Sequence, residues 1–468
     1  FFNTYSTIIK IYDFCYSKFP DLTEDDMNSR ELSDFVYGKK KGNKVKLRKL
    51  KSDFTGVIER FLIQLEIETN PLKNKIILLS SLRNRKLFKR FEKNYNYIEE
   101  IQSKMSKNDQ NYYLNRINLE TESLKMLSAL TDSKKVTLNI QNISNNTDLY
   151  FIFSKLNIFL KMNSLETDKL NIFEFKKDFY DEIQIYFEKN RETLEEYHTG
   201  FVILYYAFKM FTAKEEKYLN QLIRYFDTHR VQFSKDHLFD YYTTLENSYQ
   251  ILSNEAMGSE KYRIKKFRVF EHLYGNKDYF KEILRIEGIN MTEFVRVVKN
   301  GLNLKKYKWV LNFIEHYHIY LSDDIKNDTY NYSKAEYFYV KGQYDESLEC
   351  INKLNLKDEQ YYYLSKIILL KIYYDRDQIE SLKYLIININ KFFRKKESLF
   401  EPHVLRIKTI LKFLTELIRI KNIPVKNRNE NIAVLRKKLE NTKLMFSHKK
   451  WLMKKMDELE KKADGTLS

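Results

Sequence analysis

The sequence predicts an all-α protein in which antiparallel helix pairs stack into an α-solenoid. The first observation is the scarcity of turn residues, with ten Gly and four Pro in 468 residues. Sheets joined by tight turns usually need more of both, whereas helix pairs can be joined by Asn, Asp and Lys. The second is an apolar spacing of three and four residues along most of the chain, which is typical of amphipathic helices. The third is an internal repeat.

The repeat lies between residues 331 and 390. Glu346-Ser347-Leu348 recurs 34 residues later as Glu380-Ser381-Leu382, and Phe338-Tyr339 recurs as Ile372-Tyr373. A 34-residue period is that of the tetratricopeptide repeat, a helix pair that must stack on its neighbours to bury its apolar face. Two copies with this period predict tetratricopeptide-like helix pairs.

Within the first copy, the residue types fit a helix, a turn and a second helix. Ala335 and Phe338 share one face of the first helix, Gly342-Gln343-Tyr344 supplies the turn, and Ser347 begins the packing face of the second helix. The second copy is degenerate, because Asp375-Arg376-Asp377 replaces the glycine turn.

We expect four regions along the chain. They are a helical N-terminal module with a basic loop (1–70), a helical region of irregular repeats (71–190), the tetratricopeptide-like solenoid (191–420, clearest at 331–390) and a charged C-terminal capping helix (421–468). The polar stretch 131–147 is expected to be a loop or a brief extended piece.

The third helix of the N-terminal module is expected from about residue 45 to 68. Its predicted core face consists of apolar residues at helical spacing: Leu47, Leu50, Phe54, Val57, Ile58, Phe61 and Leu65. At the other end of the chain, a strongly charged helix is expected over 429–462.

Composition limits the function classes. The formal net charge of +18 favours acidic partners, including nucleic acid, anionic membranes and acidic proteins, although a generic Lys-rich surface would give the same number. Cys15 and Cys350 are the only cysteines, so no disulfide framework is predicted and a reducing, cytoplasmic location is expected. No apolar run reaches the roughly 18 residues that a membrane span needs, so no membrane insertion is predicted. The chain begins with Phe1 and not Met, so its true N-terminus is expected upstream.

Motifs of catalysis were sought and none was found. The sequence has no phosphate-binding Gly-x-x-x-x-Gly-Lys-Ser/Thr loop, no Gly-x-Gly-x-x-Gly and no His-Glu-x-x-His. His316 and His318 are two residues apart and therefore lie on different faces of a helix, which disfavours joint metal ligation. We expect no enzyme, no catalytic or metal site, no cofactor and no small-molecule substrate.

The predicted binding surface is the concave face formed by the first helix of each pair. Tyr rings give rigid contact area and Lys supplies steering and carboxylate pairing, so this face is expected to clamp an acidic peptide of a partner protein. The residues predicted to do so are Tyr337, Tyr339, Lys341, Tyr362 and Lys366.

A basic segment offers an alternative function. The segment joins a short helix to a longer helix through a basic turn, and the longer helix begins with basic residues. Such an arrangement could bind nucleic-acid phosphates as a helix-turn-helix does. A solvated charged loop is the competing interpretation, since the turn is long and no side-chain set is clearly aimed at base edges. The segment contains Lys39, Lys40, Lys41, Lys44, Lys46, Arg48, Lys49 and Lys51.

Both ends of the chain resemble a known family. Phe1-Phe2-Asn3, Ile11-Tyr12-Asp13, Phe19-Pro20 and Lys51-Ser52-Asp53-Phe54, together with Ala335–Leu354, are similar to motifs of an uncharacterised Bacteroidetes family of tetratricopeptide-like helical-repeat proteins. The resemblance implies a cytoplasmic tetratricopeptide-like protein. It brings no catalytic residue, because these motifs are packing signatures.

Overall fold

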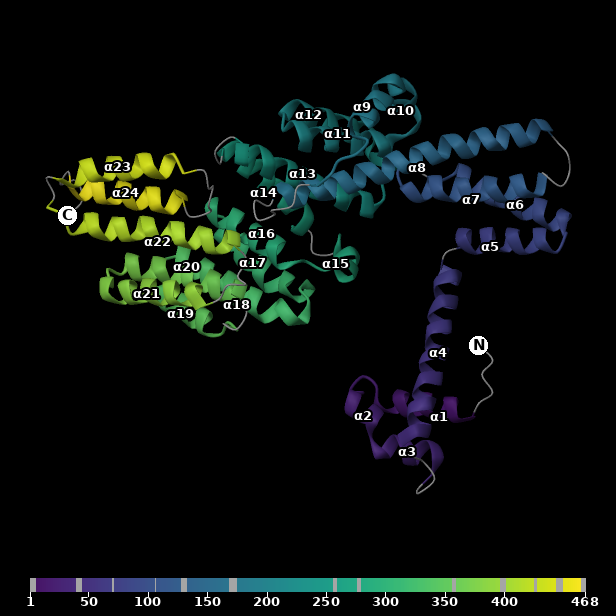
Figure 1. The fold of residues 1–468 in the computed structure, drawn as a ribbon, viewed down its shortest axis with the longest axis horizontal. Coiled ribbons are helices and arrows are strands. Elements are labelled where there is room, and N and C mark those ends of the chain that lie inside the picture. The colour runs from purple at the N-terminus through teal and green to yellow at the C-terminus, as the bar shows by residue number, and fades with distance from the viewer. Residues whose placement is uncertain are drawn as a thin grey trace. The chain divides into compact units, whose positions relative to one another are not determined.

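The computed structural model describes residues 6–38, 44–69, 71–105, 107–127, 133–167, 175–255, 259–275, 279–355, 359–395, 401–424, 427–442 and 449–463. Within these ranges every regular element is a helix and no strand occurs, so the predicted all-α class is confirmed (Figure 1). None of these helices combines the length and the apolar character needed to cross a bilayer. The chain divides into unit 1 (residues 1–155 and 189–201) and unit 2 (residues 156–188 and 202–468). Each unit is described by itself.

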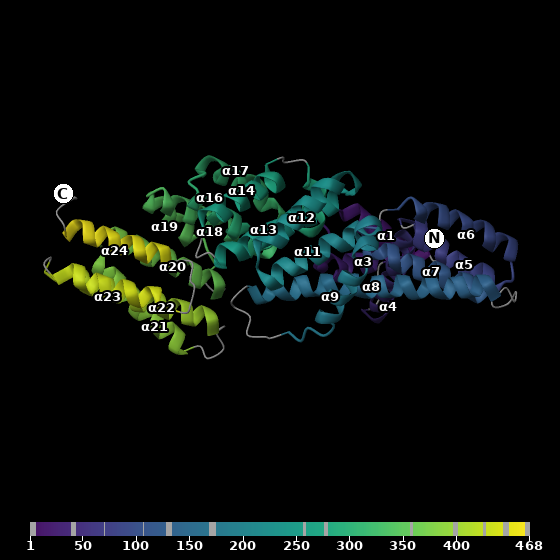
Figure 2. The same cartoon turned by 90° about the horizontal axis from the view of Figure 1, so that it is seen from above.

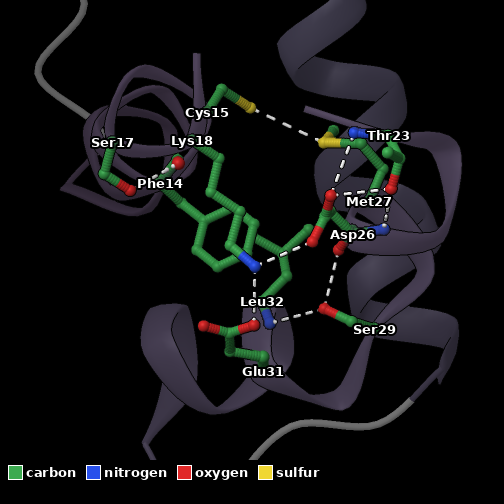
Figure 3. Close-up of polar contacts among 10 residues, drawn as sticks. All are labelled: Phe14, Cys15, Ser17, Lys18, Thr23, Asp26, Met27, Ser29, Glu31 and Leu32. Atoms are coloured by element: carbon green, nitrogen blue, oxygen red, sulfur yellow. Dashed lines mark hydrogen bonds and ion pairs between the residues drawn. The ribbon is translucent and has the colours of Figure 1, made fainter. Parts of the chain in front are cut away.

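Unit 1 begins with a small helical module. Its helices are α1 (Ser6–Lys18), α2 (Glu24–Asn28), α3 (Arg30–Tyr37) and the first half of α4 (Lys44–Thr69). Thr23 caps α2 through a capping box with Asp26, and the Lys18 ammonium lies 2.7 Å from both the Asp26 and the Glu31 carboxylates (Figure 3). These contacts fix α1 against α2 and α3. Between them and α4 lies an apolar core that includes Ile11, Phe14, Leu32, Val36, Leu47 and Leu50.

The predicted core face of α4 is correct only for its first half. Leu47, Leu50 and Phe54 are buried, whereas Phe61 and Leu65 are 50 % and 45 % exposed. The helix continues beyond the module that covers its first turns. Helical spacing predicts which residues share a face, but not how far the neighbouring helices extend along it.

The rest of unit 1 is a bundle of longer helices. They are α5 (Pro71–Asn84), α6 (Phe88–Ser103), α7 (Gln110–Leu127), most of α8 (Ser133–Thr167) and α10 (Arg191–Tyr197). The loop or extended piece predicted over 131–147 is wrong for residues 133–147, because α8 is helical from Ser133 onward; residues 131 and 132 lie outside the described residues. Its polar side chains hydrogen-bond within the helix: Gln141 donates to Asn145 at 2.8 Å and Asn146 donates to the Asn142 carbonyl at 2.8 Å. The Asn-rich composition is therefore compatible with a helix here.

Unit 2 is a succession of helix pairs (Figure 1, Figure 2). Helices α16, α18, α20 and α22 each pack against the helix that follows, and each also packs against the next helix but one. The helices of this unit are α9 (Tyr180–Lys189), α11 (Thr199–Ala213), α12 (Glu216–His229), α13 (Lys235–Glu255), α14 (Glu260–Tyr274), α15 (Lys281–Glu287), α16 (Met291–Asn303), α17 (Tyr307–Tyr317), α18 (Asp323–Val340), α19 (Tyr344–Asn352), α20 (Glu359–Asp375), α21 (Ile379–Lys395), α22 (Glu401–Lys421), α23 (Arg428–Glu440) and α24 (Lys449–Ala463), with 3-10 turns η1 (Arg230–Gln232) and η2 (His318–Tyr320).

The turn inside the predicted repeat recurs in three consecutive pairs. Gly342 has φ +77° and lies before Gln343, whose N–H donates to the Phe338 carbonyl at 2.9 Å. Lys305 and Asp377 also have positive φ, and each precedes an N–H that reaches back five residues over 2.9 Å. This is the Schellman arrangement that ends a helix. Of these three turns, only the middle one has glycine at the positive-φ position. The backbone conformation is therefore repeated, although the residue type at this position is not.

Two predicted packing positions of the clear repeat, Ala335 and Ser347, are fully buried, and Phe338 is partly buried. The Ser347 hydroxyl donates to the Ala335 carbonyl at 2.8 Å. This contact brings α18 and α19 close together.

The charged helix predicted over 429–462 is two helices. α23 ends at Glu440 and α24 begins at Lys449, and the two pack against each other and against α22. Arg436 on α23 lies 2.8 Å from Asp457 and 2.7 Å from Glu460 on α24. The charge pattern predicted a helix correctly. It did not predict that two helices pair, because the ion pairs between them join side chains that are 21 and 24 residues apart in the sequence.

Candidate partner-binding surface

Tyr337 lies in the last turn of α18, and Lys341 is the residue that follows the helix, four residues later and on the same face. Lys341 is exposed, and its Nζ lies 5.0 Å from the centroid of the Tyr307 ring on α17. Tyr337 is half-buried one turn earlier. These two predicted residues therefore lie beside α17.

Tyr339 lies in a different environment. Its hydroxyl donates to Asp375 Oδ2 at 2.8 Å and accepts from Trp451 Nε1 at 2.8 Å. Burial, together with the Asp375 charge, raises the pKa of Tyr339 far above its usual range. The hydroxyl of Tyr339 on α18 therefore connects this helix to Asp375 of α20 and to Trp451 of α24.

Tyr362 and Lys366 form a third location, on α20 against α21. The Tyr362 ring stacks on Phe392 with a centroid separation of 4.0 Å, and Lys366 Nζ lies 4.9 Å from the Tyr362 centroid. Burial lowers the pKa of Lys366. In the part of the chain that the structure describes, no carboxylate pairs with Lys366. The five predicted residues are therefore distributed over three places.

The sequence did not predict a buried charged row that runs through unit 2. The row joins α13, α14, α16, α18, α20 and α24, and we define it by its members: Glu246, Lys266, Arg296, Lys299, Glu336, Lys371, Asp375 and Lys455.

The row begins around Glu246 on α13. Its carboxylate lies 3.6 Å from Lys266 Nζ and 3.3 Å from Arg296 Nη2. Lys266 is almost completely buried, and this burial lowers its pKa to about 8 against the attraction of Glu246. Burying the charged Lys266 ammonium at this end of the row therefore costs desolvation free energy.

The middle of the row centres on Glu336 of α18. The Tyr332 hydroxyl donates to Glu336 Oε1 at 2.6 Å, and Lys299 Nζ lies 3.4 Å from the same oxygen. Burial works against the charge on Glu336, but Lys299 and Lys371 outweigh it and lower its pKa. Burial in turn lowers the pKa of Lys371, although Glu336 attracts its charge.

The far end of the row is closed by α24. Lys455 Nζ lies 2.8 Å from Asp375 Oδ1, and both side chains are about one-tenth exposed or less, at 11 % and 8 %. Trp451 is one turn before Lys455, so one face of α24 supplies both the indole donor and the ammonium group.

Several buried polar atoms on the same helices lack a hydrogen-bond partner. Among the described residues of unit 2, these include Glu246 Oε1, Arg263 Nε, Arg296 Nε, Asn300 Oδ1 and Ser333 Oγ, which belong to α13, α14, α16 and α18. Buried polar groups are usually satisfied, so these atoms add to the polar character of the interior around the row. Arg296 and Lys299 keep side-chain exposures of 31 % and 29 %, which leaves both cations reachable.

A polar cleft of about 570 Å³ lies in unit 1. Its walls include Glu99 of α6, Arg116 of α7 and Asn142 of α8, together with His198, which follows α10. His198 Nδ1 lies 2.8 Å from the Tyr113 hydroxyl. Burial and the nearby Lys107 charge lower the pKa of His198 to about 4, so the ring is neutral at pH 7. No group of three or more His, Cys, Asp or Glu within the described ranges is placed to hold a metal ion.

The basic segment of the alternative function is only partly described. Lys39, Lys40 and Lys41 lie outside the described residues. The remaining members lie on the first turns of α4, where Lys44, Lys46, Arg48 and Lys49 are exposed. Lys51 instead donates to Asn28 Oδ1 at 2.7 Å.

Comparisons with protein-family models, with curated proteins and with solved structures found no match to this chain.

Proposed function

We propose that this protein is a non-catalytic protein–protein interaction scaffold, built as an α-solenoid of tetratricopeptide-like helix pairs, that binds an acidic segment of a partner protein. The repeated backbone turns at Lys305, Gly342 and Asp377 support the solenoid, since helix pairs that share one kind of turn can stack in a similar way. The resemblance to the Bacteroidetes helical-repeat family points the same way and is part of the proposal.

The observation that carries the proposed function is the pair of partly exposed cations on α16. Arg296 Nη2 lies 3.3 Å from Glu246 and Lys299 Nζ lies 3.4 Å from Glu336, and their side chains remain 31 % and 29 % exposed. Two cations that reach solvent one turn apart favour an anionic ligand, because its carboxylates can pair with both.

The accessible members of the row are the expected contacts. Arg296 and Lys299 lie one turn apart on α16 and remain about one-third exposed, so a carboxylate side chain of a partner can pair with both. Lys341, the residue directly after α18, is exposed and steers the acidic segment. A location in the cytoplasm belongs to the same proposal, since both cysteines of the chain are free thiols.

Affinity capture from the lysate of the source cell tests this function. The full chain is compared with an Arg296→Gln/Lys299→Gln variant, in which Lys266 still faces Glu246 and Lys371 still faces Glu336. Lys383→Gln on α21 is the control, because its side chain is 50 % exposed. We expect a stoichiometric, nuclease-insensitive partner that the control retains and the double variant loses. A partner retained equally by all three chains would rule the charged row out as its binding site.

The second candidate function is nucleic-acid binding through the start of α4. The exposure of Lys44, Lys46, Arg48 and Lys49 favours it. Charge reversal of Lys46, Arg48 and Lys49 would then abolish salt-dependent binding to DNA or RNA in a filter assay. Unchanged binding would leave this segment as a solvated helix start.

A further inference from the structure

The second half of α4 carries an exposed apolar stripe. In the first half, Leu47, Leu50 and Phe54 pack into the core of the N-terminal module. The same three-and-four spacing continues through Ile58, Phe61 and Leu65, with Leu62 beside them. Their exposed fractions are 41 % for Ile58, 50 % for Phe61, 55 % for Leu62 and 45 % for Leu65.

The neighbours of α4 explain this exposure. Within unit 1, the main packing partners of α4 are α1 at its beginning and α5 after its end (Figure 1). Between them the stripe runs for about two turns of helix. Contiguous large apolar side chains on a surface mark an interaction site more often than single ones do.

The charges beside the stripe are mainly acidic. Glu59, Glu66 and Glu68 are exposed there, and Arg60 is the one basic residue between Ile58 and Glu68. Glu59 and Glu66 lie on one flank of the stripe and Glu68 lies on the other, given a turn of 100° per residue. This local sign is opposite to the net charge of the chain, which is +18.

We propose that the second half of α4 is a docking site for an amphipathic helix of a partner protein that carries Lys or Arg on both sides of its own apolar stripe. A helix is the matching shape, because apolar residues at three-and-four spacing interdigitate with the same spacing on a facing helix. Basic flanks are the matching charge, because flanking residues of paired helices face one another. The site belongs to unit 1 and does not depend on the function proposed for unit 2.

Two other occupants are disfavoured by the same charges. A second copy of α4 would place acidic flanks against acidic flanks, which is repulsive. An anionic lipid surface would also be repelled, whereas lipid-binding helices usually carry Lys and Arg on the polar face.

The test uses the full chain and two fluorescein-labelled designed peptides. Both peptides are helical and carry the same Leu stripe, one with Lys flanks and the other with Glu flanks, and binding is followed by fluorescence anisotropy. We expect the Lys peptide to bind at least tenfold more tightly. Nonspecific attraction to a chain of charge +18 would favour the Glu peptide, so this preference is diagnostic.

Two variants assign the binding to α4. Phe61→Ser/Leu62→Ser is expected to weaken the Lys peptide at least tenfold, and Glu59→Lys/Glu66→Lys is expected to reverse the peptide preference. Leu138→Ser/Ile140→Ser is the matched control, because it makes the same change at two exposed apolar residues of α8. Unchanged circular dichroism and melting temperature in all variants will show that they remain folded.

Four results would overturn the proposal. They are no binding of either peptide, equal binding of both, self-association of the wild-type chain that Phe61→Ser/Leu62→Ser abolishes, and binding to phosphatidylserine vesicles that this variant abolishes. The third would make a second copy the occupant, and the fourth would make it a lipid surface.

Discussion

The indole Nε1 of Trp451 donates a hydrogen bond to the hydroxyl of Tyr339 at 2.8 Å, across 112 residues of sequence. The Tyr339 hydroxyl in turn donates a hydrogen bond to Asp375. Asp375 forms an ion pair with Lys455, which lies one turn after Trp451 on α24. The C-terminal helix thus closes the buried charged row by hydrogen bonds and an ion pair as well as by apolar contacts.

Replacement of Trp451 by Phe removes the indole donor and keeps an aromatic ring. We expect a loss of about 1 kcal/mol in the free energy of unfolding, the typical value of one hydrogen bond. In a double-mutant cycle with Tyr339→Phe, urea unfolding should give a coupling of about 0.5–1.5 kcal/mol. Tyr337→Phe is the control, with an expected change within about 0.5 kcal/mol. Additive effects of the two substitutions would show that the bond contributes nothing.

Replacement of Asp375 by Asn breaks an ion pair that is buried on both sides. We expect a destabilisation of about 1–3 kcal/mol, because Lys455 loses one of the two carboxylates that lie 2.8 Å from its Nζ, the other being that of Glu458. Adding Lys455→Met should recover part of this loss in thermal melts. Lys454→Met is the control, since that side chain is 72 % exposed and its ion pair is worth at most about 0.5 kcal/mol. A double variant less stable than Asp375→Asn alone would contradict the charge argument.

Two glycines are expected to respond oppositely to alanine. A Cβ on Gly301 of α16 would collide with Val310 Cγ2 of α17, whereas one on Gly56 of α4 would meet nothing within 4 Å. We expect Gly301→Ala to destabilise by about 1–3 kcal/mol and Gly56→Ala to stabilise by about 0.5–1 kcal/mol. Midpoints of urea unfolding check both. Stabilisation by Gly301→Ala would mean that α16 and α17 are packed less closely than the structure has them.

The buried His198 makes stability depend on pH. Its pKa is lowered to about 4 in the folded chain and returns to about 6.5 on unfolding. The unfolded state therefore binds the proton more readily below pH 6.5, and stability falls as the pH drops from there toward 4. Between pH 7 and pH 5 we expect a loss of about 1–2 kcal/mol from this residue.

Thermal melts of a His198→Gln variant measure this contribution. The variant should lose less stability between pH 7 and pH 5 than the wild-type chain. His316→Gln, at an exposed histidine, is the control and should leave the wild-type dependence in place. Identical pH dependence in all three chains would remove His198 as the cause.

For the five residues predicted to bind a partner, the sequence did not predict which helices lie opposite them. Tyr337, Tyr339 and Lys341 lie within five residues of one another, but Tyr339 faces Asp375 and Trp451 while Lys341 faces Tyr307. Helical periodicity predicts that Tyr339 and Lys341, which are two residues apart, point in different directions. Only the fold decides which helix stands opposite each one.

The sequence by itself determined the helical class, the turn at Gly342 and the contact face of Ala335 and Ser347, because these depend on residues close together in the chain. Tertiary structure decided the helical state of residues 133–147, the division of the C-terminal segment into α23 and α24, and the exposure of Phe61 and Leu65. It also assembled the buried charged row from six helices. A lone Lys or Glu on a helix resembles an ordinary surface charge, and its burial depends on partners that are distant in sequence.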